Sequence, residues 1–247
     1  MTRIVVPYHL DEHLPDLDAP VEADAVVTVE LPDGDSWGRM AHLYDLVAEN
    51  VADAVRRGDR PVVVSGDCTT SLAVVAGLQR AGVSPAIVWF DAHGDVQTLE
   101  TTTSGYLGGM PLRILAGYRP ELIADGLGLR PVPEDRIVLV DARDLDPPEM
   151  EYLEHSAVRR YPVGVLTAER TPDEPIYLHV DFDVVDPEEL PGQLIPAPGG
   201  PSLQTVAEGL RRIMETGRVA AVGVACTWRP GAGASERARE ALAAAGI

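Results

Sequence analysis

The sequence has 247 residues, of which 45% are hydrophobic, and its 39 acidic and 20 basic residues give a formal net charge of −19. This charge argues against nucleic acid or an anionic membrane as a partner, because either would require a basic face on the protein. All 20 basic positions are arginine, so the chain has neither a Schiff-base lysine nor a phosphate-loop lysine.

Short apolar runs rich in valine and isoleucine recur along the chain and predict strands. Most of them are hydrophobic throughout, which is typical of strands buried on both faces of a parallel sheet. In chain order the predicted strands are Arg3–Pro7, Ala25–Leu31, Pro61–Ser65, Ala86–Phe90, Arg136–Val140, Ile176–Val180 and Val219–Ala225.

Amphipathic segments between these runs predict helices. Residues 36–58 repeat apolar side chains at three- and four-residue spacing and end in Arg-Arg-Gly. Residues 70–82 and 202–217 likewise begin at Thr or Ser and finish at Gly. The alternation of strands and helices predicts a three-layer αβα fold with a parallel sheet. Because no long linker or repeat interrupts it, we expect a single domain over residues 1–247.

The sequence also indicates where in the cell the protein is expected. No stretch approaches the roughly 20 apolar residues of a membrane span, and the N-terminal residues lack the long apolar core of a secretory signal. The two cysteines, Cys68 and Cys226, do not form a disulfide framework and fit a reducing compartment. We therefore expect a cytoplasmic protein with no membrane partner.

Acidic side chains and a histidine gather where two predicted strands end. Asp91, His93 and Asp95 alternate after one strand, and Asp181 and Asp183 alternate after another. Alternate residues of an extended chain point the same way, and ligands of parallel sheets bind outside the carboxyl ends of the strands. Helix capping explains single acids well but not these alternating sets, because neighbouring buried anions repel unless a cation lies between them. We expect a metal site.

The motifs resemble those of the arginase/agmatinase (ureohydrolase) family. "SGDCTTS" (65–71), "DAHGD" (91–95) and "DFDVVDP" (181–187) follow that family's three metal motifs in order, and the resemblance spans roughly residues 60 to 215. It implies an eight-stranded parallel sheet, two Mn²⁺ ions, a small guanidino or amidino substrate, and a homo-oligomer, either a trimer or a hexamer.

The resemblance also implies a ligand set. Asp91 and Asp181 correspond to the carboxylates that bridge both ions, while His93 and Asp183 would complete one shell and Asp95 the other. The family's first-motif histidine, a ligand of the Asp95-bound ion, falls on Cys68. Thiolate is a softer ligand that suits Zn²⁺, Co²⁺ or Fe²⁺ better than Mn²⁺. The alternative is that Cys68 is a small buried residue and that this ion is weakly held or absent.

The implied reaction is hydrolysis of a linear amidine or guanidine C–N bond by a metal-bridging hydroxide. Asp95 and His93 are the candidate catalytic residues, with Asp95 as the general acid and base. In the loop that follows, the resemblance implies that Gln97, Ser104 and Tyr106 occupy the positions that bind the substrate's head group. The family has asparagine, serine and asparagine there, so Tyr106 departs from the pattern.

Two further positions depart from the family pattern. The family's proton-shuttling histidine falls on Gly108, and its guanidinium-binding glutamate falls near Cys226, with no acid nearby. Either another acid such as Glu100 supplies the charge or the substrate is not a free guanidinium. The alternative function is a degenerate relative that binds metal or a small ligand without hydrolysis. A single-zinc deacetylase on a related fold is a weaker alternative, because the sequence has no His-His pair.

Overall fold

A computed structural model describes residues 1–247 and contains one eight-stranded sheet in which every pairing is parallel. The strand order is β4-β1-β5-β10-β9-β6-β7-β8. The strands are β1 (Thr2–Val6), β4 (Ala25–Val26), β5 (Pro61–Ser65), β6 (Ala86–Asp91), β7 (Ile137–Asp141), β8 (Arg159–Tyr161), β9 (Ile176–Asp181) and β10 (Val219–Ala225). A separate antiparallel hairpin pairs β2 (Tyr8–His9) with β3 (Glu12–His13).

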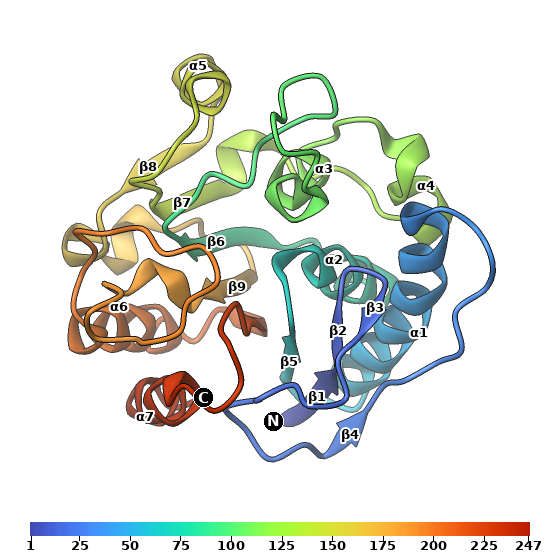
Figure 1. Ribbon diagram of the computed structural model, residues 1–247, viewed down its shortest axis with the longest axis horizontal. Helices are drawn as coiled ribbons and strands as arrows, with labels where there is room; N and C mark the ends of the chain where they lie inside the picture. The colour runs from blue at the N-terminus through green and yellow to red at the C-terminus, as the bar shows by residue number, and fades with distance from the viewer.

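Helices cover both faces of the sheet and complete the three layers (Figure 1). The helices are α1 (Ser36–Arg56), α2 (Ser71–Arg80), α3 (Pro111–Leu115), α4 (Ala124–Leu127), α5 (Pro147–His155), α6 (Leu203–Met214) and α7 (Ala234–Ala245). Buried side chains of α1 and α2 form one hydrophobic core with the sheet, and those of α6 and α7 form a second core on the other side. The predicted three-layer αβα fold is therefore confirmed. No helix combines the length and apolar character needed to cross a bilayer.

The edges of the sheet differ most from the prediction. The strand predicted over Ala25–Leu31 was too long, because only Ala25 and Val26 pair with β1. Beyond them the Val29 backbone bonds the Tyr8 hydroxyl group instead of a strand. β8 was not predicted: it is an edge strand with two arginines and no apolar run. Helices α5 and α7 were also not predicted.

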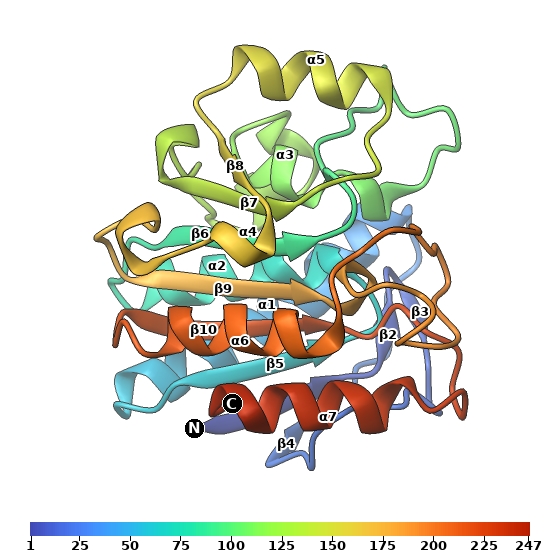
Figure 2. The same cartoon turned by 90° about the vertical axis from the view of Figure 1, so that its left-hand side faces the viewer.

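The four central strands place the acidic motifs together. β5, β10, β9 and β6 lie side by side, and all end at the same edge of the sheet, toward which the arrows in Figure 2 point. Cys68 follows β5, Asp91 and Asp181 end β6 and β9, and Thr227 follows β10. Residues from four distant parts of the sequence therefore meet at the centre of one edge.

Candidate metal centre

A cavity of about 190 Å³ opens at this edge, and every residue predicted for the site lines it. The predicted residues that line it are Cys68, Asp91, His93, Asp95, Gln97, Ser104, Tyr106, Asp181 and Asp183. Their assignment as ligands and catalytic groups remains a prediction. The structure establishes that they converge, which is the geometric condition that the assignment requires.

Backbone hydrogen bonds hold the carboxylates of Asp91, Asp181 and Asp183 in position. Asp91 Oδ1 accepts a hydrogen bond from the His93 amide at 2.7 Å, and Asp181 Oδ1 accepts one from the Asp183 amide at 2.9 Å. The Ala92 amide donates to Asp183 Oδ1 at 3.2 Å, which ties the two turns to each other. These bonds fix the carboxylates before any ligand arrives, because the donors belong to the turns that follow β6 and β9.

Asp95 reaches the cavity through an unusual backbone conformation. Its φ is +53°, in the left-handed region, which aspartate tolerates better than most residues. The side chain is 5% exposed, and its Oδ2 atom is buried with no hydrogen-bond partner. A buried carboxylate oxygen without a partner is costly unless a proton or a cation satisfies it.

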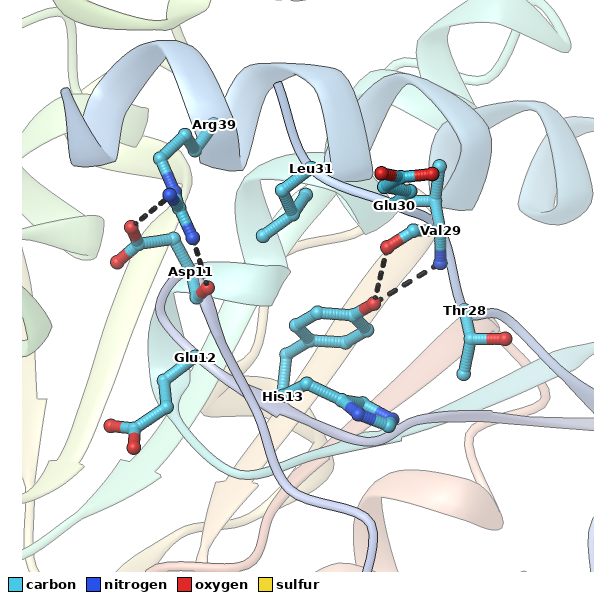
Figure 3. Close-up of a pocket in the computed structure, with 9 residues that line it drawn as sticks. Asp11, Glu12, His13, Thr28, Val29, Glu30, Leu31 and Arg39 are labelled. Carbon is cyan, nitrogen blue, oxygen red and sulfur yellow. Dashed lines mark hydrogen bonds and ion pairs between the residues drawn. The ribbon is translucent and has the colours of Figure 1, made fainter. Parts of the chain in front are cut away.

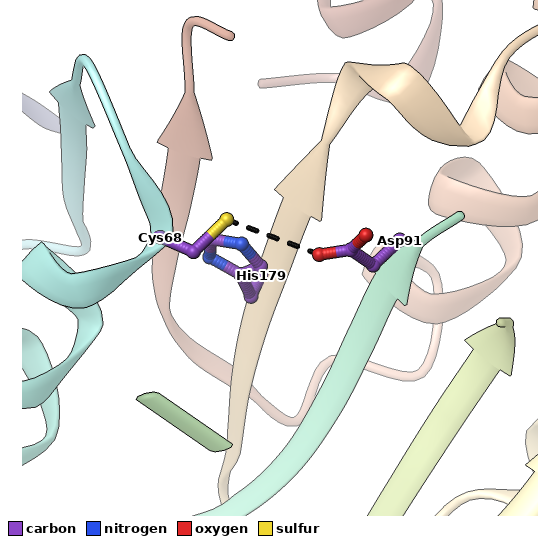
Figure 4. A group of neighbouring side chains, drawn as sticks. All are labelled: Cys68, Asp91 and His179. Atoms are coloured by element: carbon purple, nitrogen blue, oxygen red, sulfur yellow. Dashed lines mark hydrogen bonds between the residues drawn. The ribbon is translucent and has the colours of Figure 1, made fainter. Parts of the chain in front are cut away.

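Two groups of potential metal ligands meet at Asp91. Asp91, His93 and Asp183 each offer one ligand atom within 4.8 Å of the others, and so do Cys68, Asp91 and His179 (Figure 4). In the first group His93 Nδ1 lies 3.0 Å from Asp183 Oδ2 and 3.3 Å from Asp91 Oδ1. Asp91 is therefore the residue that both groups share.

The cavity carries strong negative charge that no basic side chain in its lining offsets apart from His93. Six of its lining residues are carboxylic acids: Asp91, Asp95, Asp146, Glu149, Asp181 and Asp183. Burial and the neighbouring Asp183 raise the pKa of Asp181 to about 7, and burial and Asp91 raise the pKa of Asp183 to about 6. Burial disfavours the charged form of His93, but the hydrogen bonds to Asp183 and Asp91 outweigh this effect and raise the pKa of His93 to about 12.

The residues present fit divalent cations. Without them the carboxylates must share protons, as the raised pKa values show, and Asp95 Oδ2, His93 Nε2 and His179 Nε2 are buried without partners. Carboxylate and imidazole donors suit Mn²⁺, whereas the Cys68 sulfur adds a softer donor at one side. Burial and the surrounding carboxylates raise the pKa of the Cys68 thiol, so the thiolate needs a cation to form.

The wall contains acidic residues that the sequence analysis did not assign to the site. Asp146 and Glu149 come from the loop after β7 and the start of α5, and both line the cavity. Asp146 Oδ2 accepts a hydrogen bond from Gln97 Nε2 at 2.7 Å. Glu149 accepts hydrogen bonds from the amides of Val96 and Asp146 and so joins the segment after β6 to the start of α5. The strand-end pattern "DARDLDPPE" was the available sequence signal.

The structure corrects two expectations about the acidic residue that would pair with a substrate guanidinium. Glu100 does not reach the cavity: it is exposed and bonds Tyr118 and Arg119. Cys226 does not line the cavity either, whereas its neighbour Thr227 does. Thr227 Oγ1 donates to Asp181 Oδ1 at 2.5 Å. The neutral hydroxyl group of Thr227 therefore lines the cavity where the sequence analysis expected the family's glutamate.

A larger cavity lies elsewhere. It measures about 510 Å³ and lies between the β2–β3 hairpin and the start of α1, where Arg39 pairs with Asp11 (Figure 3). Neither group of potential metal ligands lies there. Chemistry rather than volume therefore identifies the cavity at the sheet edge as the candidate site.

Comparison with known proteins gives a consistent result. The model of the arginase family matches residues 6–244. The chain is 35% identical over 149 residues to N(omega)-hydroxy-L-arginine amidinohydrolase of Streptomyces lavendulae, a match that covers 59% of this chain and 53% of the relative, about half its length. It is 27% identical to arginase of Bacillus subtilis (strain 168), over 85% of this chain and 77% of that one.

A solved structure matches the whole fold. Arginase from Bacillus caldovelox superposes with a TM-score of 0.84 and 22% identity, over 99% of this chain and 96% of that chain. At this identity the likeness establishes the fold, and it agrees with the eight-stranded parallel sheet described above.

Proposed function

This chain belongs to the arginase family, and from that premise we propose that it is a binuclear metal-dependent hydrolase of a C–N bond in a guanidino or amidino compound. The observation that carries the proposal is the sharing of Asp91 between two groups of potential ligands. The proposed set of ligands follows the sequence motifs: Asp91 and Asp181 would contact both ions, His93 and Asp183 one of them, and Cys68 and Asp95 the other.

Two divalent cations bound there would lower the pKa of a shared water and make hydroxide available near neutral pH. Asp95 is suited to move the proton. Burial and the charge of Asp91 raise the pKa of Asp95, and its Oδ2 atom is free of other partners. We assign Asp95 Oδ2 the task of accepting a proton from the water and delivering it to the departing nitrogen.

The cavity wall supports a substrate with a cationic head group. Gln97 and Asp146 are bonded to each other, and Ser104 and Tyr106 lie on the same loop wall. An ammonium group of the substrate could pair there with the Asp146 carboxylate and donate a hydrogen bond to the side-chain amide oxygen of Gln97. At the other side, Thr227 is neutral, so a strongly basic guanidinium would lack a carboxylate partner there beyond the metal ligands.

This asymmetry favours an Nω-hydroxyguanidine over a guanidine, because the hydroxyl group withdraws electrons and makes the group a much weaker base. The similarity to N(omega)-hydroxy-L-arginine amidinohydrolase supports the same choice. We propose hydroxyarginine as the substrate class, with hydrolysis giving ornithine and hydroxyurea.

The test is product release by metal-loaded protein from hydroxyarginine, arginine, agmatine, guanidinobutyrate and formiminoglutamate. Turnover of hydroxyarginine with weak or no turnover of arginine is expected. An equal preference for arginine would contradict the substrate class, and no turnover of any compound would contradict the function.

A second candidate function is metal or ligand binding without hydrolysis. It is favoured by Tyr106, whose ring occupies the space that a side chain at Gly108 would need, so the family's shuttling histidine has no room. Cys68→His discriminates the two functions. Activity that appears only in this variant, with higher Mn²⁺ content, would identify the natural chain as a non-hydrolytic member.

We propose in addition that the protein is cytoplasmic and assembles as a trimer or hexamer, as its family suggests. Light scattering coupled to gel filtration measures the assembly directly. A monomer at micromolar concentration would contradict this proposal.

A further inference from the structure

His179 is a buried histidine that the family's motifs do not use. It lies on β9 two residues before Asp181, so both side chains point to the same side of the strand. Its side chain is 1% exposed. Nδ1 lies 3.0 Å from Ser71 Oγ, whereas Nε2 is buried and has no hydrogen-bond partner. One imidazole nitrogen is thus engaged and the other is left open.

The neighbouring hydroxyl groups are compatible with a proton on Nδ1, because Ser71 Oγ and the Tyr177 hydroxyl oxygen lie 3.0 and 3.3 Å from this nitrogen. The Tyr177 hydroxyl donates to Ser71 Oγ at 2.7 Å, and the same oxygen can accept a second bond from His179 Nδ1–H. This arrangement leaves a lone pair on Nε2, the form of imidazole that binds metals. An outer partner that bonds the other ring nitrogen is the usual support of a metal-bound histidine.

The ring is held beside two other potential ligands. It stacks on the indole of Trp89 with ring centroids 3.7 Å apart, and Trp89 Nε1 donates to Asp91 Oδ2 at 3.1 Å. A ligand atom from each of Cys68, Asp91 and His179 lies within 4.8 Å of the others (Figure 4). A thiol from the turn after β5, a carboxylate from β6 and an imidazole from β9 therefore converge beneath the cavity.

We infer that His179 Nε2 is a ligand of the cation beside Cys68, so that this ion is held by a thiolate, an imidazole and the carboxylate of Asp91. The inference rests on the proposed metal centre. It explains how an ion is held where the motif histidine is replaced by cysteine: the imidazole comes from β9 instead of the turn after β5. Sulfur and nitrogen donors together favour Zn²⁺, Co²⁺ or Fe²⁺ at this position, while the carboxylates and His93 suit Mn²⁺ at the other.

The experiment detects the bond directly. The full chain, labelled with ¹⁵N-histidine and loaded with ¹¹³Cd²⁺, is examined by NMR for one-bond coupling between cadmium and an imidazole nitrogen. Two coupled histidines are expected, and the signal of one is lost in His179→Gln. His42→Gln, an exposed change on α1, is the matched control and keeps both couplings.

Affinity gives a second measurement. His179→Gln should raise the dissociation constant of Zn²⁺ by more than the roughly 10- to 100-fold that loss of an outer-shell partner causes. Ser71→Ala removes only the hydrogen-bond partner of His179 Nδ1, so its effect on the dissociation constant of Zn²⁺ should stay within that range. Coupling retained by His93 in the His179→Gln protein shows that the variant is folded.

The outcomes separate this inference from the proposed function. Cadmium bound without coupling to His179 overturns the inference even when hydroxyarginine is hydrolysed. Coupling to His179 in a protein that hydrolyses nothing supports the inference and overturns the function. Failure of the chain to bind cadmium, zinc or manganese at all overturns both.

Discussion

The phenol ring of Tyr106 lies against Gly108, so that a Cβ atom added at Gly108 would collide with the ring and its hydroxyl group. The ring is held there by His9, whose Nε2 lies 3.1 Å from the Tyr106 hydroxyl and whose Nδ1 lies 3.1 Å from the Gly66 carbonyl oxygen. Tyr106 and Gly108 both depart from the family pattern, which has asparagine and histidine at these positions. Because one side chain fills the space of the other, the two departures form a single structural unit.

A histidine at position 108 should therefore be tolerated only when Tyr106 is made small. Gly108→His alone is expected to cost about 1–3 kcal/mol through overpacking, and Tyr106→Asn/Gly108→His to recover most of it. Thermal unfolding of the two variants measures the difference, at about 2–4 °C per kcal/mol for a chain of this size. Equal destabilisation in the single and double variants would contradict the coupling.

Asp91 should control the binding of both ions. Asp91→Asn removes a charge from both ligand groups, so metal analysis should find less than one ion per chain, compared with the two ions expected for the parent protein. Asp183→Asn touches only the group that contains His93 and should leave about one ion. The two variants are matched in size and charge. Identical metal content in both would show that Asp91 is not shared.

The metal-free protein should lose stability as the pH rises from about 4 to 7. Asp181 and Asp183 have pKa values of about 7 and about 6 in the folded state, raised from an ordinary 3.8 mainly by burial. Between these limits the folded chain binds more protons than the unfolded chain, so its free energy of unfolding falls with increasing pH. Above about pH 6.5 the raised pKa of His93 acts in the same direction.

Melting temperatures of the metal-free protein at pH 5 and pH 7.5 check this expectation. Added Mn²⁺ or Zn²⁺ should reverse the trend, because the ions replace the protons and bind more tightly as the pH rises. Asp181→Asn, which cannot ionise, should flatten the decline. A metal-free protein that is more stable at pH 7.5 than at pH 5 would show that the carboxylates are not held as described.

Arg143 should support the metal centre from outside the cavity. Its guanidinium pairs with Asp141 and donates to the carbonyl oxygens of Asp183, Val184 and Ala197, so it holds the turn that carries Asp183. Arg143→Ala leaves a largely buried carboxylate unpaired and is expected to cost about 3 kcal/mol, with weaker metal binding. Arg211→Ala, which breaks an exposed pair with Glu215 on α6, should cost about 0.5 kcal/mol or less. Chemical denaturation compares the two.

The parts of the fold that could be predicted from the sequence are those in which the residues of one segment determine its secondary structure. β5, β6, β9 and β10 are buried over nearly their whole length, so their apolar runs were unambiguous. The metal motifs were equally local, because alternate residues after β6 and β9 share a side. β8 was missed because an edge strand such as Arg159–Tyr161 needs no apolar run and is defined by its pairing with β7.

Other features depend on which segments meet, and these the sequence left open. Asp146 reaches the cavity because the loop after β7 lies against the turn after β6. His179 gains its neighbours from the turn after β5, from the start of α2 and from β6. The choice between Cys226 and Thr227 depended on a single residue of register. Because side chains alternate along an extended chain, that shift exchanges the side of the sheet edge to which each residue points.

Thr227 should set the preference between hydroxyguanidine and guanidine substrates. It is the neutral residue of the cavity wall next to Asp181, and Thr227→Glu would supply the anion that a guanidinium lacks there. A hydrogen bond between charged groups contributes about 1.5–3 kcal/mol, which corresponds to roughly a 10- to 100-fold gain in kcat/KM for arginine. Hydroxyarginine, being a weaker base, should gain little. Thr227→Gln is the matched control, because glutamine has the size of glutamate without its charge. Both variants lose the hydrogen bond from Thr227 to Asp181, so their metal content is measured to exclude a loss of bound ions. A similar response to Glu and Gln would show that charge at this position does not select the substrate.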